Sequence, residues 1–252
     1  MKRILFLVYG LIAYGISMFT LVYAMGFVAG VGVPKSIDSA PSAPLGTALL
    51  IDTILLAVFA VQHSAMARQG FKRVWTKIVP QAIERSTFSL AASAALVLLF
   101  WKWEPIGGVI WNADGEALRM VLRAISFAGW MFVLLSTFVI DHLDLFGVRQ
   151  VWLYFRGVPY APPQFTVRGW YAYVRHPIYF GFIVAFWATP TMTAAHLVFA
   201  IATTAHTLIA IQLEERDMVK LFGERYETYR EQVSMLVPRS PKKARGANAI
   251  RG

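Results

Sequence analysis

The feature that most constrains this chain is a stretch of 38 residues, 176–213, without Lys, Arg, Asp or Glu. As one continuous α-helix it would extend roughly 57 Å at about 1.5 Å per residue, nearly twice the roughly 30 Å hydrocarbon core of a bilayer. Residues 188–193 supply a break, because Pro190 lacks an amide proton and the neighbouring threonines favour turns. The stretch is therefore predicted to form a short hairpin, spanning or re-entrant, that returns Glu214 to the membrane side of His176.

Four further apolar runs indicate an integral membrane protein. Hydrophobic residues make up 57% of the 252 positions, and runs with at most one charge occupy residues 4–34, 45–67, 86–101 and 124–140. The first run continues well past the length of a signal-peptide core, so we interpret it as a membrane helix. The predicted fold class is all-α: a polytopic integral membrane protein with about five to six transmembrane helices and a C-terminal hairpin.

Basic residues gather in four regions that the positive-inside rule assigns to the cytoplasm. These regions are the N-terminus with Lys2, the loop 68–77, the segment 149–175 and the tail after Arg216. We therefore expect cytoplasmic N- and C-termini. The net charge of +10 then reflects proximity to anionic membrane lipid, and no nucleic-acid partner is expected. Residues 239–252 are predicted to form a basic, disordered tail.

Ionisable residues inside the apolar runs are few, which argues against a transporter. They are Asp52, His63, His196 and His206, and no internal repeat is visible. We interpret His196 as a turn residue on the non-cytoplasmic side. The chain has no cysteine and its histidines lack a recognised ligand spacing, so no metal site is expected. Polar residues gather at one membrane face, around residue 141 and around the hairpin, which is typical of an enzyme.

Residues 175–238 resemble the C-terminal half of the isoprenylcysteine carboxyl methyltransferase and phospholipid methyltransferase superfamily. The shared pattern is Arg-His-Pro-x-Tyr-x-Gly at 175–181, a membrane hairpin, Glu214-Glu215, Gly-x-x-Tyr-x-x-Tyr at 223–229, and a Val-Pro ending at 237–238. The resemblance implies that the chain binds S-adenosyl-L-methionine at the cytosolic membrane face and transfers its methyl group. The implied cofactor-binding residues are Arg175, His176, Pro177, Tyr179, Gly181, Glu214, Glu215, Tyr226, Tyr229 and Arg230.

Blocks in the preceding part of the chain resemble one branch of that superfamily, the bacterial methanethiol S-methyltransferases. The blocks lie at residues 33–38, 62–68, 80–87 and 141–152. This resemblance implies a multi-pass protein of the bacterial inner membrane that methylates a small volatile thiol, methanethiol, to dimethyl sulfide. Related NnrU-like proteins, named for nitric-oxide metabolism, share several of these blocks, so the reaction class is better specified than the substrate.

The chemistry of the cofactor is compatible with those residues. The guanidinium fork of Arg175 suits the cofactor carboxylate, although an interfacial positive charge is the alternative interpretation. Glu214 or Glu215 suits the ammonium or the ribose hydroxyls, and a solvated helix start is the alternative. His176 can bond the cofactor from the start of the hairpin.

Four other implied cofactor residues have structural alternatives or depend on helix spacing. Tyr226, Tyr229 and Arg230 are three and four residues apart, which places them on one face of a helix expected to fold back as a lid. Tyr179 is either a cofactor contact or an interfacial aromatic residue. Gly181 permits the close approach of the cofactor or of a neighbouring helix.

A thiol acceptor requires a base, because the thiolate is the strong nucleophile and an alkanethiol is a weak acid. Residues 141–144, at the cytoplasmic end of the fourth predicted helix, supply an imidazole and two carboxylates. We predict His142 as the base, with Asp144 orienting it or sharing the role and Asp141 beside it; an interfacial helix cap is the alternative. The predicted substrate pocket contains Gln62, His63, Arg149 and His206.

The predicted organisation has three parts: a four-helix transmembrane region at 1–140, a methyltransferase core at 141–238 and the tail at 239–252. Two alternative acceptors are a prenylated carboxylate and a phospholipid amine. An alternative from another class is a non-catalytic membrane protein of nitrogen-oxide metabolism, or a small transporter. The sequence does not specify an oligomeric state.

Overall fold

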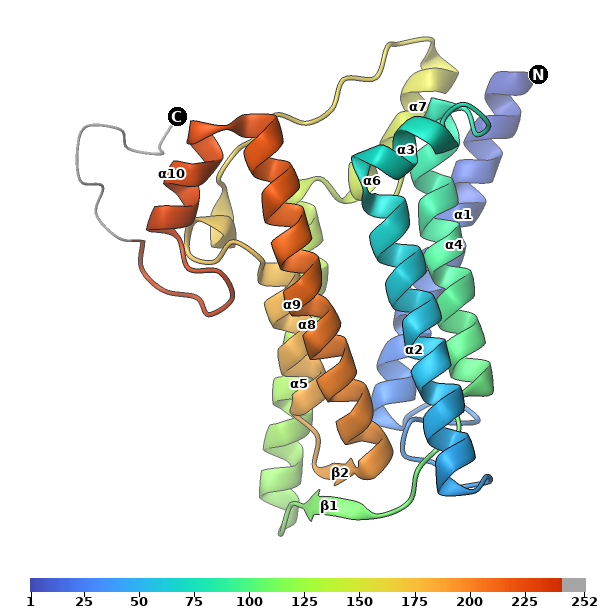
Figure 1. Ribbon diagram of the computed structural model, residues 1–252, viewed down its shortest axis with the longest axis vertical. Helices are drawn as coiled ribbons and strands as arrows, with labels where there is room; N and C mark the ends of the chain where they lie inside the picture. Colours follow the sequence, from blue (N-terminus) through green and yellow to red (C-terminus); the bar gives the residue numbers. More distant parts are fainter. Residues whose placement is uncertain (242–252) are drawn as a thin grey trace. The chain divides into compact units, whose positions relative to one another are not determined.

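Five helices in the described part of the computed structural model are long and apolar enough to cross a membrane, and 71% of the described residues are helical. They are α1 (Lys2–Ala29), α2 (Leu45–Ala67), α4 (Gln81–Lys102), α5 (Glu116–Ile140) and α9 (Ala194–Phe222), with a shorter apolar helix α8 (Pro177–Trp187) (Figure 1). The structure describes residues 1–241, so most of the predicted tail, from residue 242 onward, lies outside the described residues. The predicted all-α membrane fold is confirmed.

Short elements connect these helices. They are α3 (Gln69–Trp75), β1 (Val109–Asn112), α6 (His142–Leu145), α7 (Val148–Arg156), the 3₁₀ turn η1 (Gly169–Ala172), β2 (Thr191–Thr193) and α10 (Glu224–Gln232). The strands β1 and β2 pair antiparallel, with Asn112 opposite Thr191. This pair was not predicted, because strands of three and four residues carry no readable alternation of polar and apolar side chains.

The described chain forms two compact units that interleave along the sequence. The first contains Met1–Gly115, Asp141–Ala161 and Pro190–Phe199. The second contains Glu116–Ile140, Pro162–Thr189 and the chain from Ala200 onward. These units are defined by packing contacts, and the functional division predicted at residues 140 and 238 stays a prediction.

Buried and half-buried hydroxyl groups join the helices of the first unit. The Ser93 hydroxyl of α4 donates to the Ser17 hydroxyl of α1 at 3.1 Å, and the Tyr9 and Thr87 hydroxyls lie 3.0 Å apart. Such hydrogen bonds between small polar side chains stabilise the association of membrane helices. The hydrophobic effect does not favour that association, because lipid tails are as apolar as the side chains they replace. At one end of this unit, the Arg85 guanidinium donates to the Leu145 carbonyl at 2.9 Å and fixes the segment before α7 to α4.

The second unit contains most of the predicted hairpin, while Pro190–Phe199, with the turn and the start of α9, belong to the first unit. The two arms of the hairpin are α8 and α9, and they run antiparallel, because the Trp187 indole donates to the Thr204 hydroxyl at 3.0 Å while Tyr179 reaches Glu214. The chain reverses at residues 188–193, where the Pro190 break was predicted. The first arm has 11 residues and the second 29, so only α9 has the length of a full span.

A glycine contact sets the spacing between α5 and α8. A Cβ atom on Gly129 would lie 2.8 Å from the Gly181 carbonyl oxygen, and one on Gly181 would lie 2.8 Å from the Gly129 carbonyl oxygen. Backbone atoms cannot move aside as a flexible side chain can. The two helices therefore approach as closely as they do because both positions lack a side chain.

Alanine at either glycine is expected to destabilise the second unit. Gly129→Ala and Gly181→Ala should each lower the free energy of unfolding by about 1–3 kcal/mol through overpacking. The measurement is thermal unfolding of the purified protein in detergent. Gly15→Ala in α1 and Gly46→Ala in α2 are matched controls, because a Cβ atom there meets nothing within 4 Å. Equal unfolding temperatures for all four variants would contradict the packing role.

Candidate functional site

The two arms of the hairpin meet in a buried ionic cluster around Glu215. Its Oε1 accepts a hydrogen bond from Arg175 Nε at 2.7 Å and lies 3.0 Å from His176 Nε2. Its Oε2 pairs with Arg230 Nε at 3.1 Å. The Glu215 side chain is only 6% exposed, and a charge buried to this degree is stable only with such partners. We call these four residues the Glu215 cluster.

Arg175 has a second set of contacts, with α10. Its Nη1 donates to the Arg230 carbonyl at 2.7 Å and to the Val233 carbonyl at 2.6 Å, which caps the C-terminal end of that helix. The Arg175 amide also donates to the Ser234 carbonyl at 2.8 Å. Arg175 therefore joins the start of α8 to α9 and to the end of α10, with Nε and Nη1 both engaged by the protein.

Glu214 differs from its neighbour in having its charge uncompensated. Its Oε2 accepts a hydrogen bond from the Tyr179 hydroxyl at 3.1 Å, and no cationic side chain among residues 1–241 forms an ion pair with it. The Arg230 side chain is 44% exposed, and its Nε is the atom that binds Glu215. A carboxylate and the outer part of a guanidinium are thus available for a ligand in this part of the second unit.

The tyrosines of α10 anchor that helix through burial. Tyr226 and Tyr229 pack with Val233 in a hydrophobic cluster that Phe165 also joins, and the Tyr229 hydroxyl donates to the Tyr171 carbonyl at 2.6 Å. Burial raises the pKa of both tyrosines, so they remain protonated at neutral pH. The helix folds back as predicted, but these two rings occupy its buried face.

Two other predicted cofactor residues have packing roles in the structure. Pro177 is the first residue of α8 and is buried, a position where its missing N–H costs nothing. Gly181 faces Gly129 of α5, which supports the helix-approach alternative for this residue.

The predicted catalytic residues lie in the first unit, in and beside α6. Asp141 caps α6, because its Oδ1 accepts from the Asp144 amide at 3.0 Å. Arg149 Nη1 lies 3.1 Å from Asp144 Oδ1 and 3.8 Å from Asp141 Oδ2, so it binds both carboxylates. The Tyr160 hydroxyl donates to Asp144 Oδ2 at 3.3 Å. Asp144 is therefore directed toward Arg149 and Tyr160.

His142 is buried, with only 5% of the residue exposed. Its Nε2 lies 3.0 Å from the Tyr14 hydroxyl of α1, and its ring contacts Phe146 at 5.0 Å between centroids. Burial lowers the pKa of His142 and the nearby Asp141 carboxylate partly offsets this, so the imidazole is neutral at pH 7. A neutral imidazole can accept a proton, as a general base must.

The predicted pocket residues are distributed over both units. Gln62 donates to the Met66 sulfur at 3.1 Å, and the His63 ring lies 5.3 Å from Phe59 and 5.0 Å from Phe88. Both belong to the first unit, as does Arg149, whereas His206 lies in α9 within the second unit.

Among residues 1–241, no group of three or more His, Asp or Glu side chains is arranged to hold a metal ion.

Tyr14 and Tyr160 were not predicted as part of the site. Tyr14 is one of several tyrosines in the first apolar run, and it is 128 positions from His142. Tyr160 lies 16 positions from Asp144. The only available signal was a hydroxyl group in an otherwise apolar run, and this does not identify the partner.

Curated relatives match this chain over almost its whole length. A methanethiol S-methyltransferase of Crocosphaera subtropica is 50% identical over 244 residues, which cover 97% of this chain and 96% of the relative. A methanethiol S-methyltransferase of Mycobacterium tuberculosis is 52% identical over 238 residues, covering 94% and 98%. The chain belongs to the methanethiol S-methyltransferase family. It is therefore an enzyme of the methyltransferase class, and the predicted resemblance is confirmed.

More distant comparisons agree with this family. A family model described as phospholipid methyltransferase matches residues 120–225, which include most of α5 and the hairpin. Nurim of Mus musculus is 28% identical over 178 residues, which cover 66% of each chain. No solved structure matches the chain.

Neutralising Glu215 is expected to destabilise the second unit. Glu215→Gln leaves two guanidinium groups without their buried counter-charge, and breaking a buried ion pair in this way costs about 3–5 kcal/mol. Thermal unfolding in detergent measures this, with the exposed Glu227→Gln as the matched control. A Glu215→Gln variant as stable as the control would show that the cluster does not hold α8, α9 and α10 together.

Stability is expected to depend on pH through His142. Because the folded-state pKa lies below the ordinary value of 6.5, the unfolded chain binds a proton that the folded chain does not. The stability from this residue is therefore complete above about pH 6.5 and decreases as the pH falls toward the folded-state pKa. Unfolding temperatures measured from pH 5 to 8 should decrease less steeply for His142→Gln than for the wild type, and parallel curves would refute the assignment.

Proposed function

We propose that this protein transfers a methyl group from S-adenosyl-L-methionine to methanethiol and produces dimethyl sulfide. The observation that carries the proposal is the contrast between Glu215, whose charge is compensated by protein groups, and Glu214, whose charge is not. The uncompensated Glu214 carboxylate, next in sequence to Glu215, and the half-exposed Arg230 guanidinium, which is paired with Glu215, are suited to a ligand with both positive and negative groups. The acceptor is proposed from the names of relatives about 50% identical over nearly the whole chain.

The residues of the second unit fit the proposed cofactor. S-adenosyl-L-methionine, when bound, supplies a methyl group on a cationic sulfur. Glu214 would hold the cofactor ammonium or ribose hydroxyls, and the Arg230 guanidinium would hold its carboxylate through a fork of N–H donors. Arg175 and Glu215 then act as positioning residues, because their own contacts fix the helices that carry Arg230 and Glu214.

The residues of the first unit suit the acceptor. Methanethiol must lose a proton to become a strong nucleophile, and we assign that proton to Nε2 of the neutral His142. The Tyr14 hydroxyl, 3.0 Å from this nitrogen, orients the ring. Asp144, paired with Arg149 and Tyr160, holds the loop that carries His142. The roles of these residues, and of Gln62, His63 and His206 in the pocket, stay predictions.

The proposed location is the cytoplasmic face of a bacterial inner membrane. In the first unit, Lys2 and Gln81 line one pocket, so α1 and α4 begin at the same end. That end also carries Arg85 and Arg149, whereas at the opposite end of α4 Lys35 and Lys102 are accompanied by the acidic Glu104 and Asp52. An excess of positive charge at this end of the first unit supports a cytoplasmic N-terminus.

Substitution of Glu214 and His142 should separate cofactor binding from chemistry. Glu214→Gln keeps the shape and removes the charge, so we expect the KM for S-adenosyl-L-methionine to rise about tenfold or more, which corresponds to losing one charge-assisted hydrogen bond. His142→Asn should lower kcat about 100-fold or more with little change in that KM, as expected for loss of a general base. The assay is headspace gas chromatography of dimethyl sulfide, with Glu227→Gln as the matched control.

The same assay decides the proposal. Dimethyl sulfide from the wild type, dependent on both substrates, would support it. Cofactor binding by calorimetry without dimethyl sulfide would rule out methanethiol and leave another acceptor. The absence of both cofactor binding and product from folded protein would refute the cofactor assignment.

A further inference from the structure

A pocket of the first unit borders the residue assigned as general base. Leu7 and Leu11 of α1 line one wall, and Tyr14 follows on the same face of that helix, because residues spaced four and three apart share one side. Leu143, which directly follows His142, lines another wall. The pocket therefore runs along α1 toward the hydrogen bond of 3.0 Å between the Tyr14 hydroxyl and His142 Nε2.

The lining of this pocket is mainly apolar. Besides the three leucines it contains Val148 and Trp152 of α7. Its polar members are Asp141 and Arg149, whose side chains lie 3.8 Å apart. Asp141 directly precedes His142, so the polar part of the lining belongs to the segment that carries the base. Such a pocket suits an apolar group whose reactive atom is directed toward His142.

The size of the pocket exceeds what methanethiol needs. Its volume is about 470 Å³, within the range of roughly 300–1,000 Å³ that is typical of pockets for drug-sized ligands. Methanethiol has only one carbon and one sulfur atom, so it would leave most of this volume unfilled. A longer alkyl group would occupy it and remove apolar surface from water.

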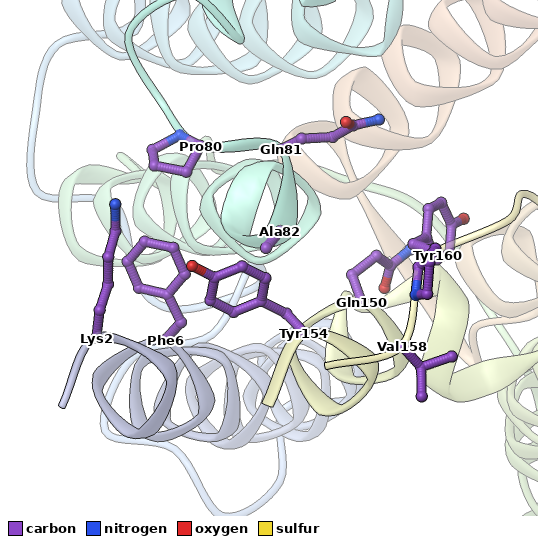
Figure 2. A pocket seen from close by; sticks show the side chains of 10 residues that line it. Lys2, Phe6, Pro80, Gln81, Ala82, Gln150, Tyr154, Val158 and Tyr160 are labelled. Carbon is purple, nitrogen blue, oxygen red and sulfur yellow. The ribbon is translucent and has the colours of Figure 1, made fainter. Parts of the chain in front are cut away.

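Another pocket of the first unit has a different chemistry. It measures about 420 Å³, and Figure 2 shows the side chains that line it, among them Lys2 and, from α7, Gln150 and Tyr154. These α7 residues are two positions from Val148 and Trp152, about 200° around the helix, so the two pockets lie against opposite faces of α7. An ammonium and an amide group would lose water to an alkyl chain without a hydrogen bond in return. The apolar pocket is therefore the one suited to an alkyl group.

We propose that the apolar pocket holds the organic group of the methyl acceptor, and that the enzyme also methylates alkanethiols larger than methanethiol, up to at least 1-butanethiol. This inference rests on the proposed thiol methylation and extends its substrate class. Leu7, Leu11 and Trp152 are then the residues that determine acceptor specificity.

The reaction of a larger thiol balances as it does for methanethiol. The proton passes from the thiol to Nε2 of the neutral His142, and the thiolate sulfur forms a bond to the methyl carbon. The bond from that carbon to the donor sulfur breaks, and its electron pair stays on the donor, which becomes S-adenosyl-L-homocysteine. The acceptor becomes a methyl thioether.

A homologous series of acceptors tests the proposal. Purified full-length protein in detergent would receive S-adenosyl-L-methionine and methanethiol, ethanethiol, 1-propanethiol or 1-butanethiol, and headspace gas chromatography would measure each methyl thioether. We expect kcat/KM to rise about two- to fourfold for each added methylene, the factor for burying that group.

Substitutions assign the effect to the pocket. Leu11→Trp places a large ring in the pocket and should lower the ratio of kcat/KM for 1-butanethiol to that for methanethiol by about tenfold or more. Leu7→Trp is a second variant should Leu11→Trp fail to fold. Leu5→Trp is the matched control, because Leu5 is 65% exposed on α1 and does not line the pocket. Partitioning of the longer thiols into detergent affects all variants equally, so the difference between variants reports the pocket.

The outcomes separate this inference from the proposed function. Dimethyl sulfide from methanethiol with a flat or falling series would keep the proposed function, leave the pocket to a lipid acyl chain and overturn the larger acceptors. A rising series that Leu7→Trp and Leu11→Trp leave unchanged would refute the pocket as the acceptor site. Folded protein that methylates none of the four thiols would refute the proposed function as well.

Discussion

The compensation of the buried Glu215 charge is the interaction on which the second unit depends. A carboxylate removed from water is stable only when cations and hydrogen-bond donors surround it, and here the partners come from three places in the sequence. Arg175 and His176 precede α8, Glu215 lies near the end of α9, and Arg230 lies on α10. One ionic cluster therefore closes the hairpin and holds α10 against it. Removing Glu215 would leave the Arg175 and Arg230 guanidinium groups without their shared counter-charge.

This arrangement explains why two adjacent glutamates have different roles. Successive residues on a helix point about 100° apart, so Glu215 can face the cluster while Glu214 faces Tyr179. Glu215 is engaged by protein groups, whereas Glu214 forms no ion pair among residues 1–241 and is the carboxylate that we propose for a ligand. The same distinction applies to the guanidinium groups. Arg175 donates hydrogen bonds to Glu215 and to carbonyls at the end of α10, whereas the Arg230 side chain is half exposed.

Much of the fold was predictable because the bilayer limits the choices. Spanning segments must satisfy their own backbone groups, so long uncharged runs become helices, and a 38-residue run with Pro190 inside must turn back. The strands β1 and β2 were not predictable, because the pairing of Asn112 with Thr191 joins residues far apart in the sequence. The contact of Tyr14 with His142 was missed for the same reason.

The sequence by itself determined the membrane class, the hairpin and the set of residues that carry the family resemblance. It did so because hydrophobic length and the order of motifs are one-dimensional properties. Only the tertiary structure decided which of those residues have their charge engaged by the protein and which do not. Glu215 and Arg175 belong to the first kind, and Glu214 and the exposed part of Arg230 belong to the second. The physical reason is that a charge becomes available or unavailable through its partners, and those partners lie 15 to 40 positions away from Glu215 along the chain.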